Sequence, residues 1–129
     1  ASLDYKIKDN QIVFFNNDGR KKIEMNCNDY LNHIKSLQVG EILLNSIDND
    51  GTGFGYDFSS IDKISSNLKI PLIIIGGAGN EKHFYKGLNN EGVSAVATAN
   101  LFNFVGDGLP NARKWLIDKN INIAKWDSQ

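Results

Sequence analysis

Three nearly unbroken apolar runs, each followed by small or polar residues, most constrain what this chain can fold into. Such runs are typical of strands that are covered on both faces, as in a parallel sheet. Each run is followed by a segment with helical spacing or a helix start signal. The runs are GEILLNSI (residues 40–47), IPLIIIGGAG (70–79) and SAVATANLF (94–102). The helices are predicted at residues 58–68, 80–92 and 110–120.

The N-terminal quarter of the chain adds one further strand–helix unit. Residues 2–7 alternate between polar and apolar, and they predict a strand. Residues 10–15 are rich in β-branched and aromatic side chains, and NNDG at 16–19 favours a hairpin turn into 20–25. Residues 28–37 have helical spacing. The order strand–helix, repeated four times, predicts an α/β fold with a parallel sheet and helical crossovers.

Length and charge exclude several classes of protein. A chain of 129 residues without a linker or low-complexity segment is expected to form a single domain, residues 1–129. The formal net charge of −1 gives no electrostatic reason to expect nucleic acid or an anionic membrane as a partner. Cys27 is the only cysteine, so no intrachain disulfide can form, and a reducing cytoplasm is the expected compartment.

In parallel α/β folds, ligands bind at the carboxyl ends of the strands. Asp4 is an acid within the first strand pattern, where a carboxylate is costly unless it has a role or a partner. Asp4, Asp48 and Asp50 are therefore candidates for acid–base chemistry. For Asp48 and Asp50 the alternative is a loop held by Asx turns, in which the side chain bonds nearby backbone. The strand ends also contribute Asn45, Ser46, Gly76, Gly77, Ala99 and Asn100.

The glycine-rich turn at residues 76–79 precedes a predicted helix. Glycines let the backbone approach an anion, and N–H groups at a helix start can bind phosphate. The alternative is a tight turn without a ligand. The segment ATANLF (97–102) supplies a second strand end followed by a short helical turn, which favours a phosphate site shared by the two strands.

No motif for a cofactor or a metal is present. The chain has no Walker loop, nucleophile elbow or dinucleotide fingerprint. His33 and His83 are predicted on helices, away from the strand ends, as surface or packing residues. With one cysteine and no histidine pair at ligand spacing, the sequence predicts neither a zinc site nor a bound cofactor.

The segments GEILLNSIDNDGTGFGYD, IIGGAG and ATANLF together resemble the cyclase subunit of imidazole glycerol phosphate synthase. That family is a (β/α)8 barrel of histidine biosynthesis with lyase-type chemistry, and the resemblance covers nearly the whole chain. SLDYK resembles its fifth strand and DNQIVFFNNDGRKK the hairpin insertion that follows. The resemblance implies that the chain is the C-terminal half of a barrel, strands five to eight.

The resemblance also implies roles for individual residues. Asp4 would be the second of two catalytic aspartates, acting as general acid or base. Glu41 would lie at the opposite end of the barrel, at a charged gate through which ammonia enters from a glutaminase subunit. The substrate would be a bis-phosphorylated ribonucleotide. Asp50 and Gly51 would support its binding, with Asn45, Ser46 and Asp48 at the same strand end, and one phosphate would be held by Gly76, Gly77, Ala99 and Asn100.

Three positions depart from the family pattern. The family usually has Thr where Asn45 stands, and Ser at the positions of Ile75 and Asn100. Asn45 and Ile75 are also similar to cyclase-like paralogues that work with a glutaminase on a sugar nucleotide in surface-polysaccharide synthesis. That acceptor is the alternative substrate. A third alternative, from another class, is a non-catalytic half-barrel module that binds phosphate.

A complete barrel of this type needs about 250 residues. The first catalytic aspartate, the first phosphate site and the other gate residues would lie in the other half. Four parallel strands with bare edges need closing, either by an N-terminal half-barrel or by a second copy of this half. We therefore expect the chain alone to have little or no cyclase activity.

Overall fold

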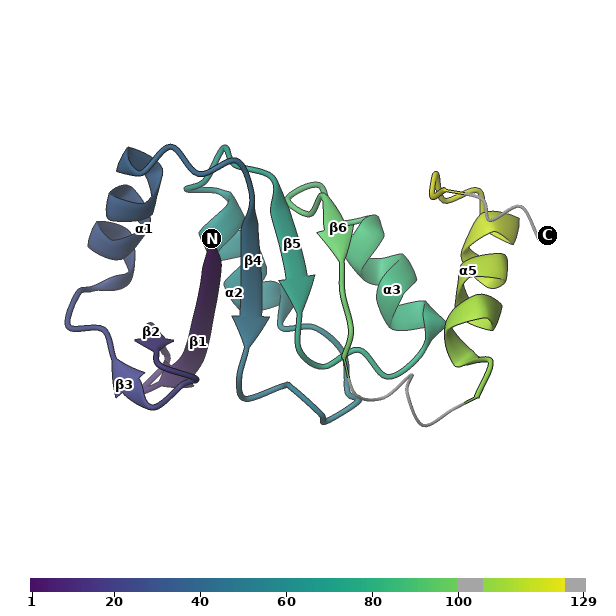
Figure 1. The fold of residues 1–129 in the computed structure, drawn as a ribbon, viewed down its shortest axis with the longest axis horizontal. Coiled ribbons are helices and arrows are strands. Elements are labelled where there is room, and N and C mark those ends of the chain that lie inside the picture. The colour runs from purple at the N-terminus through teal and green to yellow at the C-terminus, as the bar shows by residue number, and fades with distance from the viewer. Residues whose placement is uncertain (100–105, 125–129) are drawn as a thin grey trace.

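The computed structural model describes residues 1–99 and 106–124. Strands and helices alternate along most of the chain, as Figure 1 shows. The strands are β1 (Ser2–Lys8), β2 (Gln11–Asn16), β3 (Lys21–Lys22), β4 (Ile42–Ser46), β5 (Leu72–Ile75) and β6 (Ala95–Val96). The helices are α1 (Cys27–Ser36), α2 (Phe58–Ser65), α3 (Glu81–Leu88) and α5 (Gly108–Asp118).

The described strands form one mixed sheet in the order β3-β2-β1-β4-β5-β6. β1, β4, β5 and β6 pair with one another in parallel, and helices lie in the connections between them. The β2–β3 hairpin lies antiparallel beside β1 at one edge. The predicted α/β fold, with four parallel strands, helical crossovers and a hairpin insertion, is confirmed. This is the arrangement of half of a (β/α)8 barrel.

The first strand agrees with the range of residues 2–7 that the sequence predicted. β1 ends one residue later, at Lys8, and it pairs with β2 from Asp4 to Lys8. The two strands are joined by a tight turn at Asp9 and Asn10, both with positive φ. Asn and Asp tolerate this left-handed conformation better than most residues. Asp4 therefore lies within the strand rather than at its end.

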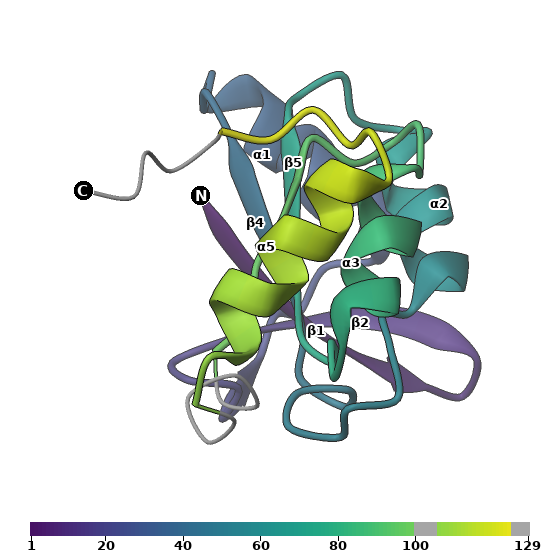
Figure 2. The same cartoon turned by 90° about the vertical axis from the view of Figure 1, so that its right-hand side faces the viewer.

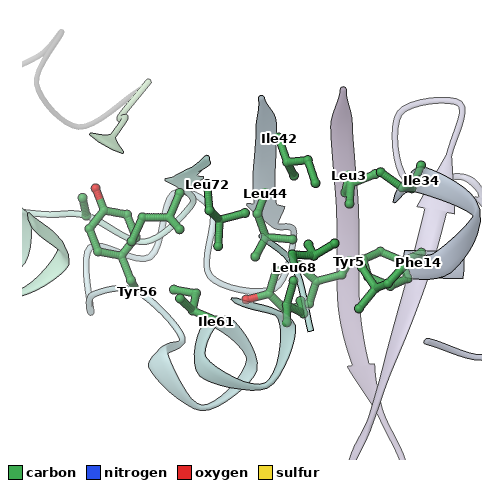
Figure 3. Packing of buried hydrophobic residues seen from close by; sticks show 14 of the residues in the cluster. Leu3, Tyr5, Phe14, Ile34, Ile42, Leu44, Tyr56, Ile61, Leu68 and Leu72 are labelled. Carbon is green, nitrogen blue, oxygen red and sulfur yellow. The ribbon is translucent and has the colours of Figure 1, made fainter. Parts of the chain in front are cut away.

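Alternation along the strands divides the sheet into two faces. Leu3 and Tyr5 of β1, like Ile42 and Leu44 of β4, are buried on the face that the helices cover, and Figure 3 shows their packing. Figure 2 shows α2 and α3 on the same side of β4 and β5. The opposite face carries the intervening residues of each strand. On that face Asp4, Leu43, Asn45, Ile73 and Ile75 are only partly buried.

Side-chain caps begin three of the helices. The Asn26 side chain accepts a hydrogen bond from the Asp29 N–H at the start of α1. The Asp57 carboxylate accepts from the Ser60 N–H at the start of α2. Asn80 accepts from two N–H groups at the start of α3. Each cap satisfies N–H groups that have no partner within the helix, so the helix starts are fixed beside the strand ends.

We expect Leu44→Ala to lower the free energy of unfolding by about 2–5 kcal/mol, because it leaves a cavity in the core. The Leu44 side chain is 1% exposed, whereas Leu37, at the end of α1, is 55% exposed. Leu37→Ala is the matched control and should change stability by less than about 0.5 kcal/mol. Urea unfolding followed by circular dichroism measures both. Equal losses in the two variants would contradict this description of the core.

Candidate active site

The loops that leave the parallel strands lie together at the end of the sheet where these strands finish (Figure 1). This end is called the rim below. The acidic loop, defined here as residues 47–57, follows β4, and the glycine turn, residues 76–79, follows β5. The Gly55 N–H donates to the Gly77 carbonyl at 2.7 Å. The Asn49 side-chain amide donates to the Gly55 carbonyl at 3.1 Å. The acidic loop and the glycine turn therefore contact each other directly through their backbones.

The acidic loop is also bonded to β1 and to the segment that follows β6. The Asp48 carboxylate accepts the Ile7 N–H at 2.9 Å, which attaches the loop to β1. The Tyr56 hydroxyl donates to the Ala97 carbonyl at 3.0 Å, just beyond β6. Burial raises the pKa of Tyr56 above its usual value, so this hydroxyl keeps its proton. The loop thus spans the rim from the first parallel strand to the last.

Asp4 and Asn45 are paired across the parallel strands β1 and β4. The Asn45 side-chain amide donates to Asp4 Oδ1 at 3.1 Å. Asn45 in turn pairs with Ile75 of β5, directly before Gly76. Asn45 Oδ1 is buried and has no hydrogen-bond partner among the described residues. A carboxylate, an amide and a glycine turn therefore lie side by side on three adjacent strands.

Glycine is required in the turn for steric reasons. Gly76 and Gly77 are buried and have φ of +95° and +108°, a region that side chains rarely adopt. A Cβ on Gly76 would overlap the Ser46 carbonyl, and one on Gly77 would overlap the Gly55 carbonyl. The close contact between the turn and the acidic loop therefore depends on the absence of side chains here.

Other residues predicted from the sequence lie apart from this group. Ser46 is buried on the helix-covered face beside Tyr5, whose hydroxyl donates to Asp57 at 3.3 Å. Burial raises the pKa of Tyr5, so it too stays protonated. The alternation of β4 thus places Ser46 on the opposite face from Asn45. Asp50 and Gly51 are exposed in the acidic loop, and the Asp50 N–H donates to the Ser46 carbonyl at 3.0 Å.

The remaining predicted residues lie at the two ends of the strands. Glu41 is exposed directly before β4, at the end opposite the glycine turn, and its carbonyl accepts from the Ala1 ammonium at 2.7 Å. Ala99 is exposed beyond β6. Asn100 lies outside the described residues.

In the described ranges we find no helix long and apolar enough to span a membrane.

Two residues near the site were not predicted to lie there. Lys6 is on the same face as Asp4, two residues closer to the rim, and its ammonium lies 5.4 Å from the centre of the Phe15 ring. The period of two along β1 could have identified it. His83, expected on the surface or in packing, accepts the Gly79 N–H at Nδ1 (3.0 Å). The sequence signal was its position, four residues after Gly79, which indicates that it lies near the glycine turn.

We expect Gly77→Ala to separate the acidic loop from the glycine turn, because the added methyl group meets the Gly55 carbonyl. The loss of stability should be about 2 kcal/mol or more, from backbone strain and the broken contact. Gly40→Ala is the control, since nothing lies within 4 Å of a Cβ at Gly40. Thermal unfolding of both variants measures the difference. A Gly77→Ala protein as stable as Gly40→Ala would contradict the close contact.

Comparison with known proteins identifies the family. The sequence model described as "Histidine biosynthesis protein" matches residues 1–106. The chain is 37% identical over 127 residues to the putative imidazole glycerol phosphate synthase subunit hisF2 of Parasynechococcus marenigrum (strain WH8102), covering 98% of this chain and 47% of that protein. It is 33% identical over 123 residues to the imidazole glycerol phosphate synthase subunit HisF of Chlorobaculum tepidum, and 34% identical over 124 residues to that of Hydrogenobaculum sp. (strain Y04AAS1). Both alignments cover 95% of this chain and 49% of the relative, so the chain spans about half the length of these relatives. The chain belongs to the histidine biosynthesis protein family.

Proposed function

We propose that this chain is the C-terminal half of a cyclase subunit of imidazole glycerol phosphate synthase. The reaction would use ammonia to convert a bis-phosphorylated ribonucleotide into imidazole glycerol phosphate and an aminoimidazole ribonucleotide. The observation that carries the proposal is the alignment of Asp4, Asn45 and Gly76 on adjacent parallel strands. The relatives, which are named as subunits of this synthase, support it over a sugar-nucleotide acceptor or a non-catalytic module.

Asp4 is the proposed general acid–base. Asn45 donates to one oxygen of the carboxylate, which fixes the orientation of the group and leaves the second oxygen for a proton of the substrate. A carboxylate held in this way can remove a proton from one position and return it to another. Lys6, on the same face, adds a positive charge close to where a phosphorylated substrate would lie.

The glycine turn is the proposed phosphate site. Gly76 and Gly77 lack side chains, so their backbone can approach an anion. Ala99 and Asn100 are proposed to complete the site from the next strand end. Asp50 and Gly51 are exposed in the acidic loop, where they are placed to contact the substrate at the rim. Asp48 has a structural role in this scheme, since its carboxylate holds Ile7.

Glu41 is proposed to belong to the ammonia gate. It lies at the end of the sheet opposite the glycine turn, so ammonia from a glutaminase subunit would cross the interior of the barrel to reach Asp4. The chain spans about half the length of its relatives, and we propose that an N-terminal half-barrel, or a second copy of this half, supplies the other strands. The reaction would take place in the cytoplasm.

The proposal is tested by combining the chain with the N-terminal half of a HisF relative and supplying ammonium salt and the bis-phosphorylated ribonucleotide. We expect turnover from the combined halves and little or none from this chain alone. In the combined protein, Asp4→Asn should lower kcat by about 10²- to 10⁴-fold, the range for loss of a general acid–base. Asp118→Asn, an exposed acid at the end of α5, is the matched control and should leave kcat unchanged.

Three results would count against the proposal. Combined halves that fold but do not turn over the ribonucleotide would exclude the assigned substrate. An Asp4→Asn variant with unchanged kcat would show that Asp4 is not the general acid–base. Full turnover by the 129-residue chain alone would show that no other half is needed.

A further inference from the structure

The junction between the acidic loop and the glycine turn is formed mainly by backbone, with the Asn49 side chain of the loop donating to the Gly55 carbonyl. Its backbone contacts are the bond from the Gly55 N–H to the Gly77 carbonyl and a close approach between Gly53 and Gly79. Gly53 and Gly55 both have positive φ. Glycine backbone loses more conformational freedom on ordering than any other. A contact between two glycine-rich segments therefore needs a neighbour that restricts both.

His83 is a side chain from outside the acidic loop that lies beside Gly55 and bonds the glycine turn. The ring lies against Gly55, where a Cβ would be 3.5 Å from Cδ2 of His83. Nδ1 of the same ring accepts the Gly79 N–H at 3.0 Å. Asn80 caps α3 by accepting the N–H groups of Lys82 and His83, which fixes the backbone from which the ring projects. One imidazole thus lies beside Gly55 of the acidic loop with its Cδ2–Nε2 side and bonds the glycine turn with Nδ1.

The contact requires a particular protonation state. Nδ1 can accept the Gly79 N–H only when it carries no proton, so the proton of the neutral ring is on Nε2. Burial lowers the pKa of His83, the nearby Lys86 lowers it further, and Glu81 opposes them. The neutral ring is thereby favoured near pH 7. Removing the acceptor would leave the Gly79 N–H, in a half-buried turn, without its partner.

We propose that His83 is a positioning residue that pre-organises the glycine turn for phosphate by holding it against the acidic loop. The inference deepens the proposed function and rests on its phosphate site. His83 does not touch the substrate in this scheme. It satisfies one N–H of the turn, at Gly79, so that the backbone at Gly76 and Gly77 is held in the conformation that approaches the anion.

A packing role and a positioning role differ in what they require of the side chain. Packing against Gly55 needs only a flat group of similar size. Positioning needs an acceptor at the place of Nδ1. His83→Asn keeps this acceptor, because Asn Oδ1 occupies nearly the same position, whereas His83→Ala removes it. His83→Gln keeps an acceptor but moves it farther along the side chain. His33→Ala, on the exposed face of α1, is the control.

The test uses the full chain and nuclear magnetic resonance, with inorganic phosphate as the probe. Amide exchange of Gly55 reports the loop–turn contact, and the amide shift of Gly77 reports phosphate binding. We expect His83→Ala to speed the Gly55 exchange and to weaken phosphate binding by about three- to tenfold, the range for loss of one hydrogen bond. His83→Asn should stay within about twofold of the parent in both measurements.

The outcomes separate the inference from the function on which it rests. Unchanged Gly55 exchange in His83→Ala, or a His83→Asn variant as impaired as His83→Ala, would overturn the positioning role. If phosphate leaves the Gly77 shift of the parent chain unchanged, the proposed phosphate site fails, while the Gly55 exchange still decides whether His83 holds the two loops. Should His83→Ala not fold, His83→Gln replaces it and should behave as the impaired variant.

Discussion

The parallel register of β1, β4 and β5 is the constraint on which the site depends. It places Asp4 beside Asn45 and Asn45 beside Ile75, one residue before the glycine turn. Because side chains alternate along a strand, a shift of the β1 register by one residue would point Asp4 toward the core and Leu3 away from it. The register is fixed by the burial of Leu3, Leu44 and their neighbours against the helices. The packing that stabilises the fold therefore also aligns the polar residues on the other face.

The acidic loop is held in place by hydrogen bonds to several strand ends. Its glycines and acids suggest a flexible segment, yet the structure bonds it to β1 through Asp48, to the glycine turn through Gly55 and to the end of β6 through Tyr56. The glycines allow close approach, and the polar side chains compensate for backbone groups that no strand satisfies. The loop connects strand ends that the sheet alone would leave independent.

The sequence predicted the parts of this structure that depend on local pattern. Apolar runs identified the parallel strands, and the acid at position 4 within an alternating segment identified the residue that the structure places beside Asn45. The sequence could also have predicted that Ser46 and Asn45 point to opposite faces of the sheet, since neighbouring strand residues do so. The position of His83, four residues after Gly79, indicated only that it lies near the glycine turn, because helical spacing does not say where a ring nitrogen lies relative to a turn.

The face that carries Asp4 and Asn45 also carries apolar side chains that the described residues do not fully cover. Leu43, Ile73 and Ile75 lie on this face and are only partly buried, although residues of this type are usually inside a folded protein. In a closed barrel the same side chains would fill the interior, with layers contributed by alternate strands. Closing the barrel would bury these apolar side chains and would surround the Asp4 carboxylate with the remaining strands. The same closure would therefore cover the apolar side chains of this face and enclose the Asp4 carboxylate.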